Sequence, residues 1–206
     1  MPSTQAKPTK LSTEEKIHRA AIDVFTRKGY DGTKTRDIAE EAGINVATLH
    51  YYHRTKEQLF NLVARESLKE FASIQQEVFT LDTPLRDKVS LFVTKHLDLL
   101  REQPHLAMFC LVESERNPEA FHEIIDFRIP HRVVGQQLQE LNEAGKIRPM
   151  SVYGFISALV GMTIYPFITK NGILHNSQMT GAEFNAFIEE QKVIIPAMIN
   201  GYLFKE

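Results

Sequence analysis

The segment from residue 35 to residue 54, TRDIAEEAGINVATLHYYHR, constrains the fold of this chain more than any other. Its apolar side chains recur at the spacing that lets two short helices pack together: Ile38, Ala42, Ile44, Leu49 and Tyr52. Ala39 is small where the helices must cross closely, and Gly43 lies in the turn, where glycine adopts a left-handed backbone at little cost. Asn45 can then cap the second helix. The pattern predicts a helix-turn-helix, a motif that places its second helix in the major groove of duplex DNA.

Helix signals continue on both sides of this motif. Residues 12–15, STEE, have the form of a capping box, and the helix that follows has an apolar stripe and ends at Gly29. We expect Thr33 to cap the first helix of the motif. The stripe consists of Ile17, Ala20, Ala21, Val24 and Phe25.

Downstream, the apolar spacing is helical throughout. A long helix from residue 55 has a buried side of Phe60, Val63, Ser67, Phe71, Ile74 and Val78, and the next helix has an inner face of Leu85, Val89, Phe92, His96 and Leu99. Residues 106–112 are apolar on every side, which favours a central helix. We expect one helix over 118–142 bent at Pro130, an uncharged helix over 149–170, a loop over 171–181, and a last helix over 182–203 interrupted near Pro196.

The predicted fold class is all-α, with about nine helices. It comprises a disordered arm over residues 1–11, a three-helix helix-turn-helix DNA-binding domain over 12–56, and a larger helical effector-binding and dimerisation domain over 57–206. The arm is either a frayed terminus or an extension that contacts DNA phosphates.

Charge is unevenly distributed. The chain of 206 residues has a net charge of −2, but residues 1–56 carry 10 basic and 7 acidic side chains, so the first part is basic and the rest acidic. This asymmetry suits a protein that approaches DNA with one face. Cys110 is the single cysteine, which excludes an internal disulfide and is typical of a cytoplasmic protein. We therefore expect the protein in the cytoplasm, and we expect no secretion signal.

Residues 149–169 carry no charged side chain and are long enough to resemble a membrane span. Small residues share one face of this segment, which would suit close helix packing in a membrane as well as in a protein core. No basic cluster flanks it, so we expect a buried helix and no membrane association.

The order of features resembles the TetR/AcrR family of bacterial transcriptional regulators over about residues 14–63. The matching positions are residues 20–25, 29–30, 33, 37–39, 42–44, 48–49 and 55–60. The resemblance implies a ligand-responsive regulator, most often a repressor, that binds a palindromic operator as a homodimer and leaves it when a small molecule binds the C-terminal domain. It names neither the effector nor the operator.

Two positions depart from the family pattern. His50 stands where a tyrosine commonly contacts phosphate, and His53 stands where a phenylalanine packs the second helix. We interpret His53 as a core histidine, with a pH sensor as the alternative.

The residues expected to contact DNA lie in the motif and just after it. Arg36 can form a bidentate pair with guanine, and the candidates for base edges are Val46, Ala47, Thr48 and Tyr51. The candidates for phosphates are Thr35, Asn45, His50, Tyr52 and Lys56. The alternatives are that Asn45 only caps its helix and that Tyr52 mainly packs.

One recognition helix reads too few base pairs for useful specificity, so a homodimer is expected. Its predicted interface is Gly154, Ala158 and Gly161 on one helix and Val193, Ile194, Ala197 and Met198 on the last helix. The resemblance implies that these helices form a four-helix bundle with their mates, whereas the alternative is packing within one chain.

The central helices supply candidate residues for an effector pocket, namely Phe92, His96, His105, Met108, Phe109, Cys110, Glu113, His122, Phe127 and Phe167. They are also consistent with plain core. We expect a partly apolar small molecule and no cofactor. A metal site from His96, His105, Cys110 and His122 has no tight ligand spacing, so no metal is expected.

An enzyme and an interaction protein are the two alternative function classes. The chain lacks a phosphate loop, Gly-x-Ser-x-Gly, His-Glu-x-x-His and Cys-x-x-Cys, so we expect no enzymatic activity. An interaction protein that has lost DNA binding is the second alternative, and the presence of Arg36 and Lys56 argues against it.

Overall fold

The computed structural model describes residues 11–205, except residues 105, 117 and 125–127 and the side chains of residues 120, 122 and 124. The predicted arm, His105, Phe127 and the His122 side chain therefore lie outside the described residues. In the described part the chain is helical, as predicted, and an isolated β-bridge joins Ile147 to Phe204.

The chain divides into two compact units, an N-terminal unit that ends at Glu66 and a C-terminal unit that begins at Ser67. The first helices are α1 (Thr13–Gly32), α2 (Thr35–Glu41), α3 (Val46–Tyr52) and α4 (Lys56–Thr80), which begins in one unit and ends in the other. The others are α5 (Leu85–Glu102), α6 (Leu106–Arg116), α7 (Pro118–Ile124), α8 (Arg128–Glu143), α9 (Val152–Ile168), α10 (Lys170–Asn176) and α11 (Gly181–Leu203).

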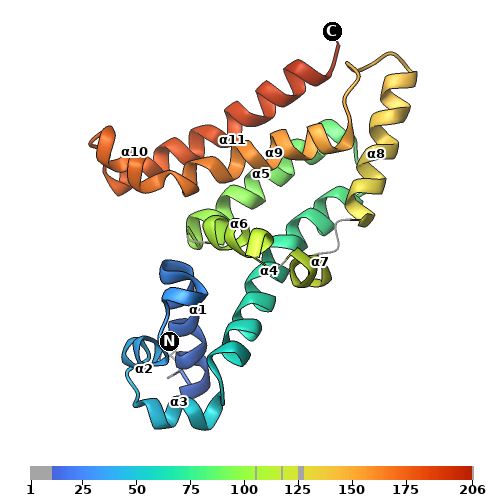
Figure 1. Cartoon of the computed structure of the whole chain (residues 1–206). Coiled ribbons are helices and arrows are strands. Elements are labelled where there is room, and N and C mark those ends of the chain that lie inside the picture. The colour runs from blue at the N-terminus through green and yellow to red at the C-terminus, as the bar shows by residue number, and fades with distance from the viewer. Residues whose placement is uncertain (1–10, 105, 117, 125–127, 206) are drawn as a thin grey trace, which may run out of the picture. The chain divides into compact units, whose positions relative to one another are not determined.

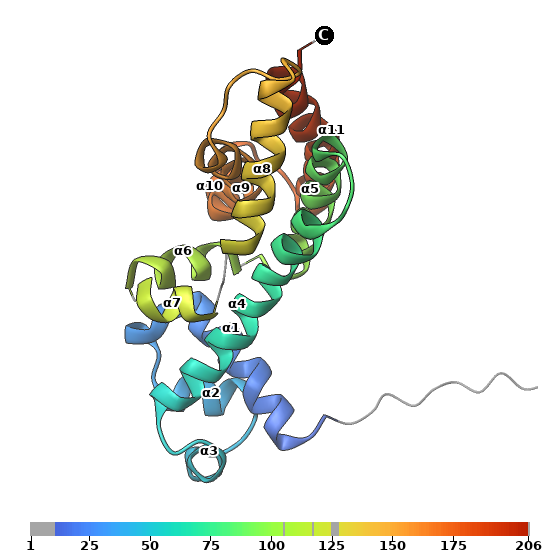
Figure 2. The same ribbon diagram turned by 90° about the vertical axis from the view of Figure 1, so that its right-hand side faces the viewer.

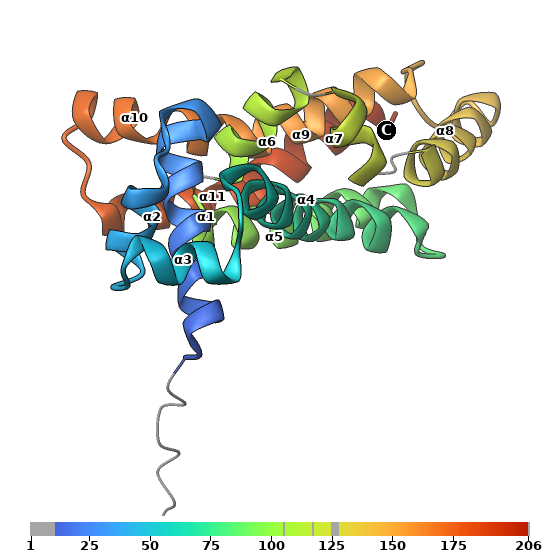
Figure 3. The same ribbon diagram turned by 60° about the horizontal axis from the view of Figure 1, so that its bottom comes forward.

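The N-terminal unit is built as the apolar spacing predicts. The five stripe residues of α1 are buried, and the capping box is present, with the Ser12 N–H donating to Glu15 Oε2 over 2.7 Å. Aromatic rings join α1 to the start of α4, because Phe25 and Tyr30 each lie 4.9 Å from the Phe60 ring centroid, edge to face. Figure 3 shows α1, α2 and α3 grouped around one another.

The expected cap at Thr33 is wrong. The Thr33 hydroxyl donates back to the Gly29 carbonyl over 2.7 Å, and Lys34 occupies the N-cap position of α2. Gly29 has a φ of +68°, which ends the regular part of α1 as predicted and brings its carbonyl within reach of that hydroxyl.

The C-terminal unit is organised around α5, which packs against α9 and α11, as Figures 1 and 2 show. Its predicted inner face is buried, and so is the predicted side of α4. Lys88 of α5 is also fully buried, because its Nζ donates to the Phe79 carbonyl of α4 and to Gln137 Oε1 of α8, over 3.0 Å each. A buried ammonium therefore joins three helices.

Within the helix expected over 118–142, the structure describes α7 and α8, and residues 125–127 between them lie outside the described residues. Pro130 lies in the first turn of α8, where a missing N–H costs nothing. Three expectations about the other helices are wrong. Helix α11 is one helix from Gly181 to Leu203, with no interruption near Pro196. The expected loop over 171–181 contains α10. Helix α6 is not enclosed on every side, because Leu111 and Val112 remain 43% and 45% exposed.

Candidate nucleic-acid interface and internal cavity

The turn between α2 and α3 has the geometry that its residues predict. Gly43 has a φ of +67°, in the left-handed region. Asn45 is the N-cap of α3, and its Oδ1 accepts from the Thr48 N–H over 2.7 Å and from the Thr48 hydroxyl over 3.0 Å. Leu49 is 1% exposed and anchors the helix. The cap uses the Asn45 oxygen and leaves its amide N–H2 group available to a ligand.

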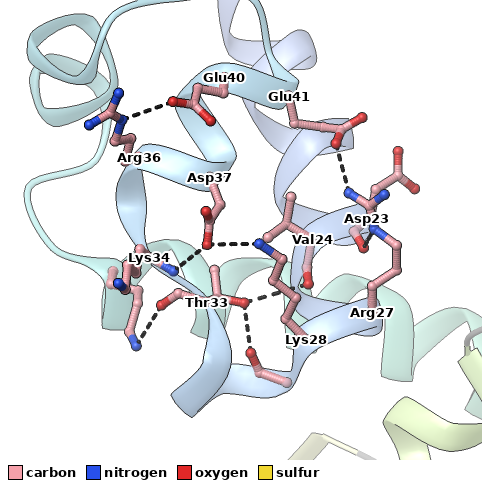
Figure 4. Close-up of polar contacts among 12 residues, drawn as sticks. Asp23, Val24, Arg27, Lys28, Thr33, Lys34, Arg36, Asp37, Glu40 and Glu41 are labelled. Carbon is pink, nitrogen blue, oxygen red and sulfur yellow. Dashed lines mark hydrogen bonds and ion pairs between the residues drawn. The ribbon is translucent and has the colours of Figure 1, made fainter.

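Ion pairs hold α2 against α1 (Figure 4). The Asp37 carboxylate accepts from the Lys34 N–H over 3.0 Å and pairs with Lys28 at 3.1 Å, while Arg27 pairs with Glu41 at 2.7 Å. The backbone N–H of Lys34, followed by Lys28, lowers the pKa of Asp37, so this carboxylate is ionised at neutral pH. The pairs link α2 to α1, while Ile38 and Ala39 provide the buried contacts of α2.

Arg36 points away from these α1–α2 ion pairs in Figure 4. Its Nε lies 2.8 Å from Glu40 Oε1, one helical turn later, and the two side chains are 80% and 64% exposed. The terminal amino groups of Arg36 have no partner among the described residues. A guanidinium held by its Nε alone still has a fork of donors for another group.

The rest of the predicted contact set follows the exposed side of α3. Ala47, His50, Tyr51 and Tyr52 are exposed, with Tyr51 at 84%, while Thr35, Val46 and Thr48 are half-buried. Tyr52 is therefore not simply a packing residue. Its ring lies 5.5 Å from that of Tyr51, edge to face.

Lys56 is placed differently from a free phosphate ligand. Its Nζ donates to the carbonyls of Tyr30 and Thr33 over 2.9 and 3.1 Å and lies 4.1 Å from the Tyr30 ring centroid. An ammonium has three donors, so one remains for a further group. The first role that the structure gives Lys56 is to hold the end of α1 to the start of α4.

His53 ends α3, with its N–H donating to the Leu49 carbonyl over 2.8 Å. Its ring is half-buried, and Nε2 has no partner among the described residues. Burial lowers the pKa of His53, against the opposing charge of Glu14, so the ring is uncharged at neutral pH. This placement is consistent with a core histidine.

A cavity of about 480 Å³ lies within the C-terminal unit. Its described lining comes from α4, α6, α7, α8 and α9. The lining residues are Phe71, Gln75, Ala107, Cys110, Leu111, Ser114, Phe121, His131, Tyr153, Ile156, Ser157, Val160, Gly161 and Ile164. Its size and apolar wall are typical of small-molecule sites.

Of the pocket residues expected from the sequence, the structure places Cys110 in this wall. Phe92, His96, Phe109 and Phe167 pack in the core, and Met108 is 39% exposed. Glu113 is buried and forms ion-paired hydrogen bonds with Arg116, with the shortest at 2.7 Å. The apolar spacing predicted the buried side of α4 but did not predict that Phe71 and Gln75 line the cavity. Which residues of α4 face the cavity depends on helices that are distant in the sequence.

His96 joins α5 to α9. Its Nδ1 lies 2.8 Å from Thr163 Oγ1, and that hydroxyl lies 2.9 Å from the Val160 carbonyl and 3.1 Å from that of Leu159. The single hydroxyl proton goes to a carbonyl, so Nδ1 of His96 carries the proton that Thr163 accepts. Burial lowers the pKa of His96 to about 3, and the ring is neutral.

The residues expected at a dimer interface are at least partly exposed on α9 and α11. Gly154, Gly161, Ala197, Val193 and Met198 are exposed, and Ala158 and Ile194 are half-buried. A Cβ at Gly161 would meet nothing within 4 Å in its own chain. This surface is available to a second protein.

Among the residues that the structure describes, no group of three or more His, Cys, Asp or Glu side chains could hold a metal ion. No single described helix is both long enough and apolar enough for a membrane span. Helices α9 and α10 meet the length and composition criteria only together, and they are bent by 57°.

Comparisons with known proteins point to one family. Residues 17–63, within the N-terminal unit, match the family described as bacterial regulatory proteins, tetR family. The fatty acid metabolism regulator protein of Bacillus subtilis is 27% identical over 94 residues, which are 46% of this chain and 48% of that protein. The HTH-type transcriptional repressor KstR2 of Mycolicibacterium smegmatis is 32% identical over 93 residues, 45% of this chain and 44% of that protein.

The chain spans about half the length of the curated relatives that it matches. Likeness to solved structures extends further. The crystal structure of the regulator FadR from Bacillus subtilis in complex with stearoyl-CoA has a TM-score of 0.59, 20% identity, and coverage of 89% of this chain and 98% of that one. At 20% identity this similarity concerns the fold alone, and the matched residues include both units.

Proposed function

Because residues 17–63 match the tetR family of bacterial regulatory proteins, we propose that the chain is a member of this family, binds operator DNA through α2 and α3, and regulates transcription in response to a small molecule. The small molecule would bind the cavity of the C-terminal unit. We further propose that the protein is a repressor and that the bound molecule releases it from DNA. Chromosomal DNA lies in the cytoplasm of bacteria, so this function places the protein there.

The observation that carries the proposal is the outward face of α3. Leu49 on the inner face of this helix is buried in the unit, while Ala47, His50 and Tyr51 are exposed on its outer face. A helix that is held at its inner face and capped at its N-terminus fits the geometry of a recognition helix in the major groove.

Individual contacts follow from the side chains available. Arg36 would give its terminal amino groups to guanine, and Val46, Ala47, Thr48 and Tyr51 would meet base edges. Thr35, His50, Tyr52, the amide N–H2 of Asn45 and the remaining donor of Lys56 would meet phosphates. Base contacts would select the sequence, and phosphate contacts would set the register.

We propose a homodimer on a palindromic site. Two recognition helices double the number of base pairs read, and the surface of α9 and α11 has exposed small residues such as Gly161 and Ala197 that would let a second copy approach closely. The accompanying effector is partly apolar, in keeping with the cavity wall. The relative in complex with stearoyl-CoA is a regulator of the same fold with a partly apolar ligand.

The decisive experiment is capture of genomic DNA fragments by the purified protein, followed by sequencing and gel shifts at stated salt concentration. We expect a palindrome among the captured fragments. Arg36→Ala should weaken binding to it by about 1–3 kcal/mol and relax the preference at one base pair of each half-site.

Arg19→Ala is the matched control, because Arg19 is exposed on α1 outside the motif, and it should keep the wild-type preference. Failure of the wild-type protein to shift any fragment at low salt would refute the DNA-binding function. A uniform loss of affinity on every sequence with Arg36→Ala would refute its base contact alone.

A further inference from the structure

The cavity of the C-terminal unit has an uncharged wall at neutral pH. Its described lining contains no Asp, Glu, Lys or Arg side chain. Burial raises the pKa of the Cys110 thiol and lowers that of His131, so both side chains are neutral there. An ionised carboxylate or ammonium that entered this space would find no opposite charge among the described lining residues, and a charge that leaves water without a partner is unfavourable.

The same wall contains polar groups with unused hydrogen-bonding capacity. Gln75 of α4 is 3% exposed, and its Oε1 has no partner among the described residues. The Ser114 hydroxyl donates its only proton to the Leu111 carbonyl over 2.8 Å, which leaves its lone pairs as acceptors. A buried amide oxygen without a partner is costly, so a ligand that donates to it gains more than one that only fills space.

The size of the space limits the ligand. A volume of about 480 Å³ has room for up to roughly 16 non-hydrogen atoms, at about 30 Å³ for each water-sized group. Most of the wall is aliphatic or aromatic, including Phe71, Ile156 and Ile164, and it suits a hydrocarbon chain or ring system.

We propose that the effector is a neutral, largely aliphatic molecule that carries a hydroxyl group and donates that hydroxyl to Gln75. This proposal rests on the proposed function, because it names the class of molecule that would act on the regulator. It separates alcohols from fatty acids and amines of the same length, which carry a charge at neutral pH.

The wild-type test is calorimetric titration of the full chain with 1-decanol, decanoate and decylamine at pH 8. We expect 1-decanol to bind about 100-fold more tightly than either ion. Within the series 1-hexanol, 1-octanol and 1-decanol, affinity should rise about fourfold per methylene while the cavity fills. Absence of alcohol binding, or equal or tighter binding of an ion, would overturn the proposal.

Gln75→Met tests the hydrogen bond itself. We expect it to weaken 1-decanol about tenfold and to leave 1-methoxynonane unchanged, because that ether has the same number of non-hydrogen atoms and no donor. Gln76→Met is the matched control, since Gln76 is the exposed neighbour on α4, and neither ligand should respond to it. Equal weakening of alcohol and ether by Gln75→Met would show that Gln75 only packs, which overturns the proposed donor recognition.

The ligand-free gel shift keeps this test separate from the proposed function. A protein that binds alcohols as expected but no genomic DNA refutes the regulatory function and keeps the ligand class. A protein that binds its operator but prefers decanoate refutes the ligand class and keeps the regulatory function.

Discussion

Lys56→Met removes the ammonium that joins the end of α1 to the start of α4 and keeps most of the side-chain stem. Two hydrogen bonds from a charged donor are each worth about 1.5 kcal/mol at the low end of their range, and the contact with the Tyr30 ring adds about 0.5–1 kcal/mol. The side chain is half-buried, so water recovers part of this. We expect the N-terminal unit to lose about 2 kcal/mol of its free energy of unfolding.

The assay is urea unfolding followed by circular dichroism, with native-state hydrogen exchange of the α1 and α2 amides to assign the loss to this unit. Lys16→Met is the control, since Lys16 is exposed on α1 and has no side-chain hydrogen bond or ion pair among the described residues. The reasoning is refuted if both variants unfold alike while Lys56→Met alone loses DNA affinity. Phosphate contact would then be the main role of Lys56.

The pH dependence of the N-terminal unit provides another test. The lowered pKa of His53 means that the folded state favours the neutral ring. The free energy of unfolding should therefore fall as pH drops from about 7 to 5, and His53→Phe should reduce that loss. An equal loss of stability in the variant would exclude His53 as its source. Gly161→Ala should raise the dimer dissociation constant about tenfold in analytical ultracentrifugation if a partner packs closely there, although alanine favours the helix by about 1 kcal/mol. Gly172→Ala, on exposed α10, is its control and should leave dimerisation unchanged.

The DNA-binding motif was predictable because its signals are local. A left-handed glycine, an asparagine cap and a buried leucine act within a few residues of one another, and Gly43, Asn45 and Leu49 adopt the predicted conformation, cap and burial. Thr33 shows the limit of this approach. Its hydroxyl could serve either neighbouring helix, and the Gly29 carbonyl, exposed by the bend of α1, accepts it instead.

The cavity was not predictable in the same way. Phe92 and His96 belong to the apolar stripe of α5, and this stripe is buried as predicted. It faces α4 and α9 and packs in the core, away from the cavity wall. The cavity is lined by residues from helices far apart in sequence, so helical periodicity shows only that Phe71 and Ile156 belong to apolar sequences. The bonds of Lys56 were not predictable for a related reason, because its two carbonyl partners lie 23 and 26 positions away in the sequence.

Helix α9 belongs to the cavity wall and carries the proposed dimer surface, and Gly161 lies in both. In a dimer built on this helix, ligand entry and subunit association are thermodynamically linked. If a ligand weakens association by some factor, association weakens ligand binding by that same factor. The apparent affinity for an effector would then depend on the concentration of the protein itself, so a cell that makes more of this regulator would also change the effector concentration to which it responds.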